Sequence, residues 1–397
     1  MRRRKICVVT TSRADFGLLS GLLKAIQSDS ALTLQVIASG MHLSPDFGQT
    51  WRDIEAEGIK IDRKVRLRLT GKSSVDNLQS ISWGMIGFAK AFEELKPEIV
   101  VLLGDRFELL APAVSALMLQ VPIAHIHGGE LSEGAIDDSV RHSITKMASL
   151  HFAATETYRR RIIQMGESPG CVFNFGAPGL DKLYSSALLT QSQLEQEIGI
   201  SLKDPVALVT YHPVTRDAGS VGTQVRTLVA AIESSGLKAV FTMANADAQG
   251  AQINSRLQAA CTRNPERFKW ISHLGHRRYL SCLKHFAIMV GNSSSGLTEA
   301  PSFRMPVVNI GDRQRGRVMA ANVINVRCDE TEIAQGIKRG ISSRFRNSIR
   351  GMRNPYDRYH DGRTSERIKN VLKNTIISDE FLKKRFYDLT CSPRQSR

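Results

Sequence analysis

The sequence predicts an α/β protein with two Rossmann-like domains that face each other across a cleft. The chain has 397 residues, which is more than one ordinary hydrophobic core accommodates. Continuous apolar runs alternate with segments of helical apolar spacing, a pattern typical of a parallel sheet covered by helices on both faces. The alternation pauses near residue 176 and resumes near residue 206, so it occurs twice.

The first series of elements assigns residues 1–178 to the N-terminal domain. Its first strand, Lys5–Thr11, consists mostly of apolar and β-branched residues, and the helix Asp15–Ile26 follows it. Further strands are predicted at Leu34–Ala38, Glu98–Leu103, Pro122–Ile126, His151–Ala154 and Val172–Phe175, and further helices at Ile81–Leu95, Leu109–Leu119, Asp138–Ser149 and Glu156–Met165.

The second series assigns residues 179–370 to a C-terminal domain, which Gly176–Gln191 links to the first. Residues 371–397 are predicted to form a basic C-terminal helix or tail. The strands of the second domain are expected at Val206–Thr210, Lys238–Thr242, Phe268–Ile271, Ala287–Val290 and Val307–Ile310. Ligands of such sheets bind beyond the carboxyl ends of the strands, so the residues that follow each strand carry the functional information.

The composition excludes several classes of protein. The six cysteines are scattered and form no CxxC pair, which favours free thiols in a reducing, cytoplasmic compartment over a disulfide scaffold. The longest apolar stretch, Leu109–Ile126, is interrupted by Pro112, Gln120 and Pro122, so a helix followed by a strand explains it better than a membrane span.

The net charge of +16 is concentrated near the carboxyl end. Residues 338–397 hold 16 Lys and Arg against 6 Asp and Glu, a balance of +10. This segment could be a solvated basic surface or could attract a polyanion. We favour the surface and expect no nucleic-acid partner, because the segment lacks the interleaved aromatic residues of single-strand binders and contains no nucleic-acid module.

Charged residues follow two strands of the first domain. Arg13 lies at a helix entrance, where it could hold a phosphate or could pair with the neighbouring Asp15. Asp105 and Arg106 follow a buried strand, where water is scarce and an aspartate can transfer protons. Capping of the next helix by Asp105 is the alternative, but the position at a strand end favours function.

The loop after Pro122–Ile126 is the densest cluster of titratable residues. It could be a metal site, an acid–base loop or a solvated polar loop. Its position at a strand end of the first domain favours proton transfer, so we predict no metal. We expect His127, Glu130 and Asp137 in the active site and expect His125 to be structural.

The second domain shows features of an anion site. His212 follows Val206–Thr210 and is a candidate acid or base. The run Gly291–Glu299 places Ser293 and Ser294 between glycines before a helix, which favours a phosphate cradle over a simple cap. Gly311–Arg317 adds cationic side chains, which we expect at the same rim.

These motifs together resemble the hydrolysing UDP-N-acetylglucosamine 2-epimerases of sialic-acid-type synthesis, a family of GT-B fold. They occur in family order from near residue 6 to about residue 328. The motifs are SRADFG (12–17), GMHLSPDFG (40–48), LGDRFE (103–108), AHIHGGE (124–130), DDSVRHSITKM (137–147), HPVT (212–215), NAD (245–247), GNSSSG (291–296) with Glu299, and NIGDRQRGR (309–317).

The resemblance implies a reaction and a set of residues. A base removes the C2 proton of a UDP-linked 2-acetamido sugar while UDP leaves C1, and the resulting glycal is hydrated, without a metal or another cofactor. Better-known members carry Glu where this chain has His127. The implied catalytic residues are Asp105, His127, Glu130, Asp137 and His212, and the implied substrate-binding residues are Arg13, His42, Arg106, Asn245, Ser293, Ser294, Glu299 and Arg313.

The resemblance leaves the sugar open. UDP-N-acetylglucosamine, giving N-acetylmannosamine and UDP, is the first expectation, and UDP-N,N'-diacetylbacillosamine for legionaminic-acid synthesis is the second. A GT-B glycosyltransferase is a further alternative, because it would share the fold and the nucleotide site. We also expect a homo-oligomer, a dimer or a tetramer, with no membrane partner.

Overall fold

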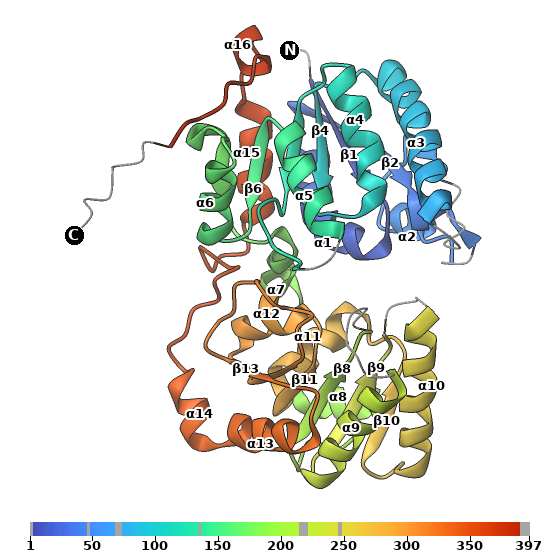
Figure 1. Ribbon diagram of the computed structural model, residues 1–397, viewed down its shortest axis with the longest axis vertical. Helices are drawn as coiled ribbons and strands as arrows, with labels where there is room; N and C mark the ends of the chain where they lie inside the picture. Colours follow the sequence, from blue (N-terminus) through green and yellow to red (C-terminus); the bar gives the residue numbers. More distant parts are fainter. Residues whose placement is uncertain are drawn as a thin grey trace, which may run out of the picture. The chain divides into compact units, whose positions relative to one another are not determined.

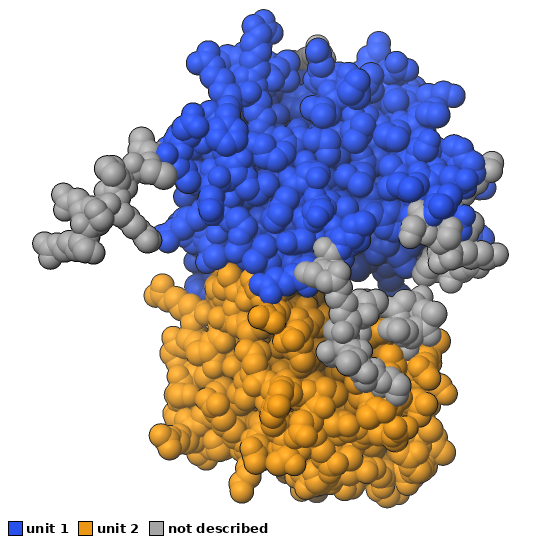
Figure 2. Space-filling view, viewed as in Figure 1, with its two compact units in different colours: residues 1–184, 356–397 blue, residues 185–355 orange. Residues whose placement is uncertain are grey.

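The computed structural model describes residues 3–45, 48–67, 74–133, 136–213, 221–244 and 248–389. They form two compact units, residues 1–184 with 356–397 (unit 1) and residues 185–355 (unit 2) (Figures 1 and 2). The chain therefore leaves unit 1 once and returns to it. The expected domain boundaries were residues 178 and 370. The second differs because helix α15 (Thr364–Asn374) joins the core of unit 1.

Unit 1 is built on a seven-stranded sheet in which all neighbouring strands are parallel. The strand order is β3-β2-β1-β4-β5-β6-β7, so the chain changes direction across the sheet between β1 and β4. Ligands of doubly wound sheets bind at this switch point. The strands are β1 (Arg4–Thr10), β2 (Leu32–Ser39), β3 (Arg63–Val65), β4 (Ile99–Leu103), β5 (Ile123–Ile126), β6 (Leu150–Ala153) and β7 (Val172–Asn174).

Helices cover both faces of this sheet. Successive residues of β1 alternate between two apolar clusters, Ile6 and Val8 in one and Cys7 and Val9 in the other, because side chains of a strand point to opposite faces. The helices of unit 1 are α1 (Arg13–Ser28), α2 (Trp51–Ala56), α3 (Ser74–Leu95), α4 (Leu110–Met118), α5 (Ile136–Met147), α6 (Glu156–Gln164), α7 (Asp181–Ser185), α15 and α16 (Asp379–Leu382).

Part of the basic C-terminal segment packs on unit 1. Lys384 Nζ donates to the carbonyl oxygens of Lys146 and Ala148 at 2.6 Å and bonds to Glu167 Oε2 at 2.7 Å. Burial alone would raise the pKa of Glu167, but hydrogen bonds from His151, Lys146 and Lys384 lower it to about 2. At least one lysine of the segment therefore anchors the tail in place.

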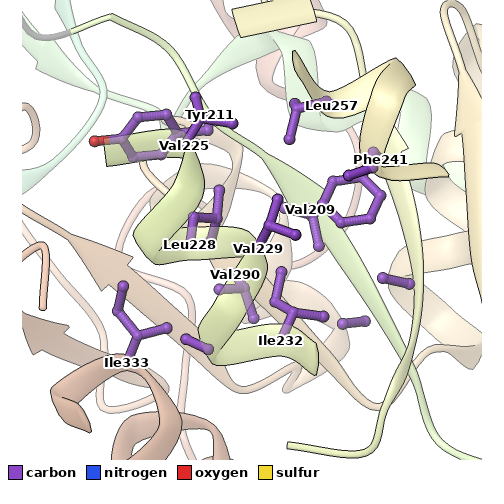
Figure 3. Close-up of a cluster of buried hydrophobic side chains, with 14 of the residues drawn as sticks. Val209, Tyr211, Val225, Leu228, Val229, Ile232, Phe241, Leu257, Val290 and Ile333 are labelled. Atoms are coloured by element: carbon purple, nitrogen blue, oxygen red, sulfur yellow. The ribbon is translucent and has the colours of Figure 1, made fainter. Parts of the chain in front are cut away.

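Unit 2 contains a six-stranded parallel sheet of order β10-β9-β8-β11-β12-β13, with its switch point between β8 and β11. Figure 3 shows α9 contributing Val225, Leu228, Val229 and Ile232 to the core beside Val209 of β8. The strands are β8 (Val206–Thr210), β9 (Lys238–Thr242), β10 (Phe268–Ile271), β11 (Ile288–Gly291), β12 (Val307–Ile310) and β13 (Val323–Val326); the helices are α8 (Gln191–Ile198), α9 (Val221–Ser234), α10 (Ala248–Arg263), α11 (Gly275–His285), α12 (Ser295–Thr298), α13 (Glu330–Ile341) and α14 (Ser343–Ser348).

The predicted α/β class with two Rossmann-like domains is confirmed, and every strand expected from the sequence is present. No helix within the described ranges is long and apolar enough to cross a membrane.

Candidate active site

The turn after β1 is closed by the carboxylate of Asp15. It accepts hydrogen bonds from the backbone N–H groups of Thr11 and Ser12, both at 2.7 Å, and of Phe16 at 3.1 Å. Asp15 therefore caps α1. Arg13, in the first turn of this helix, has a side chain that is 57% exposed and lies 3.7 Å from Asp53 Oδ2.

His42 follows β2 in a short 3-10 turn, Gly40–Leu43, and is fully buried. Its Nε2 lies 3.0 Å from Thr10 Oγ1, and its Nδ1 lies 2.8 Å from Thr50 Oγ1. Burial lowers the pKa of this imidazole, so the ring is neutral near pH 7. Because both ring nitrogens are occupied by hydroxyl groups, this geometry favours a role in holding the ends of β1 and β2 over direct substrate binding.

Asp105, directly after β4, is hydrogen-bonded to the buried guanidinium of Arg141 on α5. The same guanidinium reaches Ser132 Oγ at 3.2 Å and lies 3.6 Å from Asp138 Oδ1. These contacts fix the position of the Asp105 carboxylate at the end of β4. Arg141 lies within the DDSVRHSITKM motif, but the sequence pattern alone gives it no role.

Arg106 lies beside Asp105 and is fixed by a neighbouring carboxylate. Its Nη2 bonds to Oε1 of the buried Glu108 at 2.6 Å. Burial alone would lower the pKa of Arg106, but the charges of Glu108, Asp15 and Asp137 raise it. These influences place the predicted residues Arg106 and Asp137 in the same electrostatic neighbourhood.

His125, on β5, is fully buried and links the turn after β4 to helix α5. Its Nε2 lies 2.8 Å from the carbonyl oxygen of Gly104, and its Nδ1 lies 3.1 Å from Thr145 Oγ1. Burial lowers its pKa to about 3, so the ring is neutral. Because a carbonyl can only accept, the proton that bonds to Gly104 is on Nε2. His125 thus positions the residue before Asp105, which agrees with the expected structural role.

His127 and Glu130 form a pair in the loop that follows β5. Nδ1 of His127 lies 2.6 Å from Glu130 Oε1, and the two side chains are 14% and 8% exposed. His127 has a φ of +64°, which is uncommon for a residue other than glycine. Its Nε2 is buried and has no hydrogen-bond partner. Strain and an unsatisfied ring nitrogen together are typical of functional sites.

The acidic pair at the start of α5 divides into two roles. Asp138 accepts a hydrogen bond from the backbone N–H of Ser132 at 2.8 Å and so ties the preceding loop to α5. Asp137, in the first turn of α5, is half-buried. Among the described residues of the chain, no cluster of three or more His, Cys, Asp or Glu side chains could hold a metal ion.

In unit 2, Asn292 connects the ends of the two strands at the switch point, β8 and β11. Its side chain accepts from the backbone N–H of His212 at 2.7 Å and donates to the carbonyl oxygen of His212 at 2.8 Å. A Cβ on the preceding Gly291 would lie 1.9 Å from the carbonyl oxygen of Thr210, so only glycine allows this approach of β8 and β11. Asn292 lies within the GNSSSG motif, but the sequence pattern alone gives it no role.

Arg313, another predicted nucleotide-binding residue of unit 2, contacts this asparagine. Arg313 Nη1 and Gln314 Nε2 donate to the carbonyl oxygen of Asn292 at 3.0 and 2.8 Å. Ser293 and Ser294 precede α12, and Glu299, which follows it, accepts from Thr298 Oγ1 at 2.7 Å. Asn245 lies outside the described residues.

His212 is largely buried, and burial together with the charge of Arg313 lowers its pKa to about 4. Its imidazole is therefore neutral near pH 7 in the free protein. It lies at the end of β8, where the sequence predicted a candidate acid or base.

Two arginines of the Gly311–Arg317 loop are placed differently from the expectation. Arg315 and Arg317 line a cavity whose lining includes none of Ser293, Ser294, Glu299 and Arg313. The loop therefore presents successive side chains to two different places. Of the arginines in this loop, Arg313 is the one that contacts Asn292, whereas Arg315 and Arg317 line the other cavity.

Comparison with known proteins agrees with the resemblance seen in the motifs. The family model of UDP-N-acetylglucosamine 2-epimerase matches residues 24–373. A GDP/UDP-N,N'-diacetylbacillosamine 2-epimerase (hydrolyzing) from Campylobacter jejuni is 40% identical over 390 residues, 98% of this chain and 100% of the relative. A UDP-N,N'-diacetylbacillosamine 2-epimerase (hydrolyzing) from Legionella pneumophila is 34% identical and covers 96% of this chain and 98% of its own.

Among solved structures, the UDP-GlcNAc 2-epimerase from Neisseria meningitidis bound to UDP-GlcNAc matches with a TM-score of 0.79 at 18% identity. The match covers 93% of this chain and 100% of that chain. At this identity the likeness shows the fold, which is of GT-B type. The family match over most of the sequence goes further, and this chain belongs to the UDP-N-acetylglucosamine 2-epimerase family.

Proposed function

We propose that the protein is a hydrolysing 2-epimerase that converts UDP-N,N'-diacetylbacillosamine to UDP and the free 2-epimerised sugar. The observation that carries this proposal is the 40% identity, over nearly the whole of both chains, to a relative named GDP/UDP-N,N'-diacetylbacillosamine 2-epimerase (hydrolyzing). The sequence motifs do not separate this sugar from UDP-N-acetylglucosamine, which was the first expectation; the relatives at 40% and 34% identity support the diacetylated sugar.

In the proposed reaction, a base removes the proton from C2 while the C1–O bond breaks and UDP leaves with its electron pair. Water then adds to the glycal, with a hydroxyl at C1 and a proton at C2 from the opposite face. A C2 proton beside an amide nitrogen is weakly acidic, so deprotonation and leaving-group departure must assist each other.

We assign the proton transfers to side chains of unit 1. Asp105 is the proposed base, because it directly follows β4 and its carboxylate is held in place by the hydrogen bond from Arg141. Glu130 and Asp137 are the other candidate carboxyl groups, and His127 holds Glu130 by its Nδ1. Two carboxyl groups in different environments can serve as base and acid in the same site.

We assign nucleotide binding mainly to unit 2. Ser293 and Ser294 supply hydroxyl groups, Arg313 supplies a cation, and Glu299 can accept from ribose hydroxyls. His212 is neutral in the free protein, so it acts first as a hydrogen-bond donor. The negative charge of a bound diphosphate would raise its pKa and allow it to protonate the leaving group.

A second candidate substrate is UDP-N-acetylglucosamine, the first expectation of the sequence analysis. The observation that favours it is a relative named UDP-N-acetylglucosamine 2-epimerase from Neisseria meningitidis serogroup B, which is 30% identical over 390 residues, 97% of this chain and 99% of the relative. A glycosyltransferase of the same fold would predict sugar transfer to an acceptor and no exchange at C2.

Incubation with each UDP-sugar in deuterated water tests the proposal. The released sugar should carry one deuterium at C2 by mass spectrometry, at a higher kcat/KM for the diacetylated substrate. Asp105→Asn should abolish turnover but keep UDP affinity within about twofold, whereas Ser294→Ala should weaken UDP binding about tenfold. Absence of UDP release from both sugars would refute the activity.

A further inference from the structure

We propose that unit 2 contains a second ligand site, for a sugar that carries a carboxylate or a phosphate. The site is the cavity lined by α9, by the loop after β12 and by the end of β13. Its volume is about 840 Å³, within the range of small-molecule sites. It lies beyond the carboxyl ends of β12 and β13, at the edge of the sheet where α/β proteins bind ligands.

The charges of the lining favour an anion. Arg327 and Glu332 neutralise each other, because the Nε of Arg327 donates to Glu332 Oε1 at 2.6 Å and its backbone N–H donates to Oε2 at 2.8 Å. The remaining charged lining residues are Arg315 and Arg317 against Asp312, a balance of +1. Guanidinium groups bind carboxylates and phosphates with paired hydrogen bonds.

The neutral part of the lining favours a body rich in hydroxyl groups. Asn309 is 2% exposed and donates to Asn325 Oδ1 at 2.9 Å, which fixes the orientation of both amides. Gln224 is 5% exposed, and its Oε1 accepts from Tyr211 at 3.2 Å. Buried amides held in this way, with Thr223 and Thr227 beside them, can read the positions of hydroxyl groups.

The lining argues against a second nucleotide. None of the residues that line the cavity in the described part of unit 2 is aromatic, and Val326, Met319 and Cys328 are its apolar members. A nucleobase is usually held by stacking on an aromatic ring or an apolar platform. We therefore assign the cavity to an anionic sugar.

The test is calorimetric titration of the full chain at saturating UDP, so that the serine-rich loop is already occupied. The probes are glucuronate, glucose 6-phosphate and neutral glucose. We expect at least one anionic probe to bind with a Kd of about 1 mM or tighter, and glucose to bind at least about tenfold more weakly. Binding of glucuronate alone assigns a carboxylate ligand, and binding of glucose 6-phosphate alone assigns a phosphate ligand.

Variants locate the site. Arg317→Gln should weaken the anionic probe at least about tenfold, whereas Arg344→Gln, which removes an exposed charge from α14, should leave it unchanged. If Arg317→Gln lowers the unfolding midpoint, Asn325→Asp provides a second test, because a carboxylate in the lining should repel the probe. No binding of either anionic probe up to about 10 mM, equal affinity for glucose, or unchanged binding in these variants overturns the proposal. The exchange at C2 is measured separately, so this failure leaves the proposed epimerase activity standing.

Discussion

His42, His125 and His127 of unit 1 all lie in the sequence motifs. Their ring nitrogens, however, differ in their hydrogen-bond partners. Both nitrogens of His42 and of His125 are occupied by protein groups, whereas Nε2 of His127 has no hydrogen-bond partner. A buried ring with both nitrogens satisfied has no capacity left for a substrate. Partner occupancy therefore sets His127 apart from His42 and His125, and a linear motif does not contain that information.

The buried His125 should make the stability of unit 1 depend on pH. Its pKa is about 3 in the folded protein and about 6.5 in an unfolded chain, so between these values the unfolded state binds the extra proton. The free energy of unfolding should therefore fall as the pH drops below about 6.5, by about 2 kcal/mol from this residue at pH 5.

Urea unfolding of the wild type and of His125→Gln at pH 7.5 and pH 5.0 measures this effect. The other histidines titrate in both proteins. The difference between the two proteins in the unfolding free energy lost from pH 7.5 to pH 5.0 therefore isolates the contribution of His125. The variant should be less stable at pH 7.5 but should lose about 2 kcal/mol less on acidification. Parallel losses in the two proteins would show that His125 becomes protonated without cost.

The sequence pattern pointed to the candidate site residues, but it did not point to the side chains that contact and position them. Asp105 and His212 were found because polar residues directly follow buried apolar runs. Arg141 and Asn292 were not, because their roles depend on contacts 36 and 80 residues away along the chain. Such pairings become visible only when the strand order is known.

At the scale of elements, the loop between β5 and α5 combines strain with close packing. His127 adopts a left-handed conformation, and Gly129, two residues later, has a φ of +74°. The backbone N–H of His127 still donates to Phe152 O at 3.0 Å, so the parallel ladder with β6 continues to this residue. The strain is therefore confined to a turn that aims the imidazole toward Glu130.

Replacement of His127 by glycine and by alanine should measure this strain. Both variants lose the hydrogen bond to Glu130, but only alanine retains a Cβ at a positive φ. The glycine variant should therefore be more stable than the alanine variant by about 0.5–1 kcal/mol, despite the greater flexibility of glycine in the unfolded chain. Chemical unfolding of the two variants provides the measurement. A more stable alanine variant would exclude backbone strain at this position.

Among the strands, the two that the sequence missed are both at sheet edges. β3 has three residues, two of them the cations Arg63 and Lys64, and β13 is only partly buried. A central strand of a parallel sheet is covered on both faces and becomes a continuous apolar run, whereas an edge strand need not. Apolar runs therefore predicted the inner strands and missed these two edges.

At the scale of the whole molecule, the chain completes unit 1 only after unit 2 has been built. Helix α15 supplies Ile368 and Leu372 to the cluster that contains Ile6, Leu19 and Leu22. A Cβ on Gly21 would lie 2.9 Å from Ser365 Oγ, so glycine permits the close contact between α1 and α15. The apolar spacing of residues 364–374 indicates a helix, but it does not indicate which core receives that helix, and the expected boundary at residue 370 differs for this reason.

Because α15 packs in the core of unit 1, we expect a substitution near the carboxyl end of the chain to destabilise unit 1 selectively. Leu372 is fully buried, so Leu372→Ala should cost about 2–5 kcal/mol, whereas Asn370→Ala, at an exposed position of the same helix, should change stability by less than about 0.5 kcal/mol. Hydrogen exchange followed by mass spectrometry resolves where the loss occurs. Peptides from β1 and α1 should exchange faster in Leu372→Ala, and peptides from β8 and β11 should keep their protection. Equal loss of protection in both units would show that they unfold as one cooperative body and that α15 stabilises the whole chain.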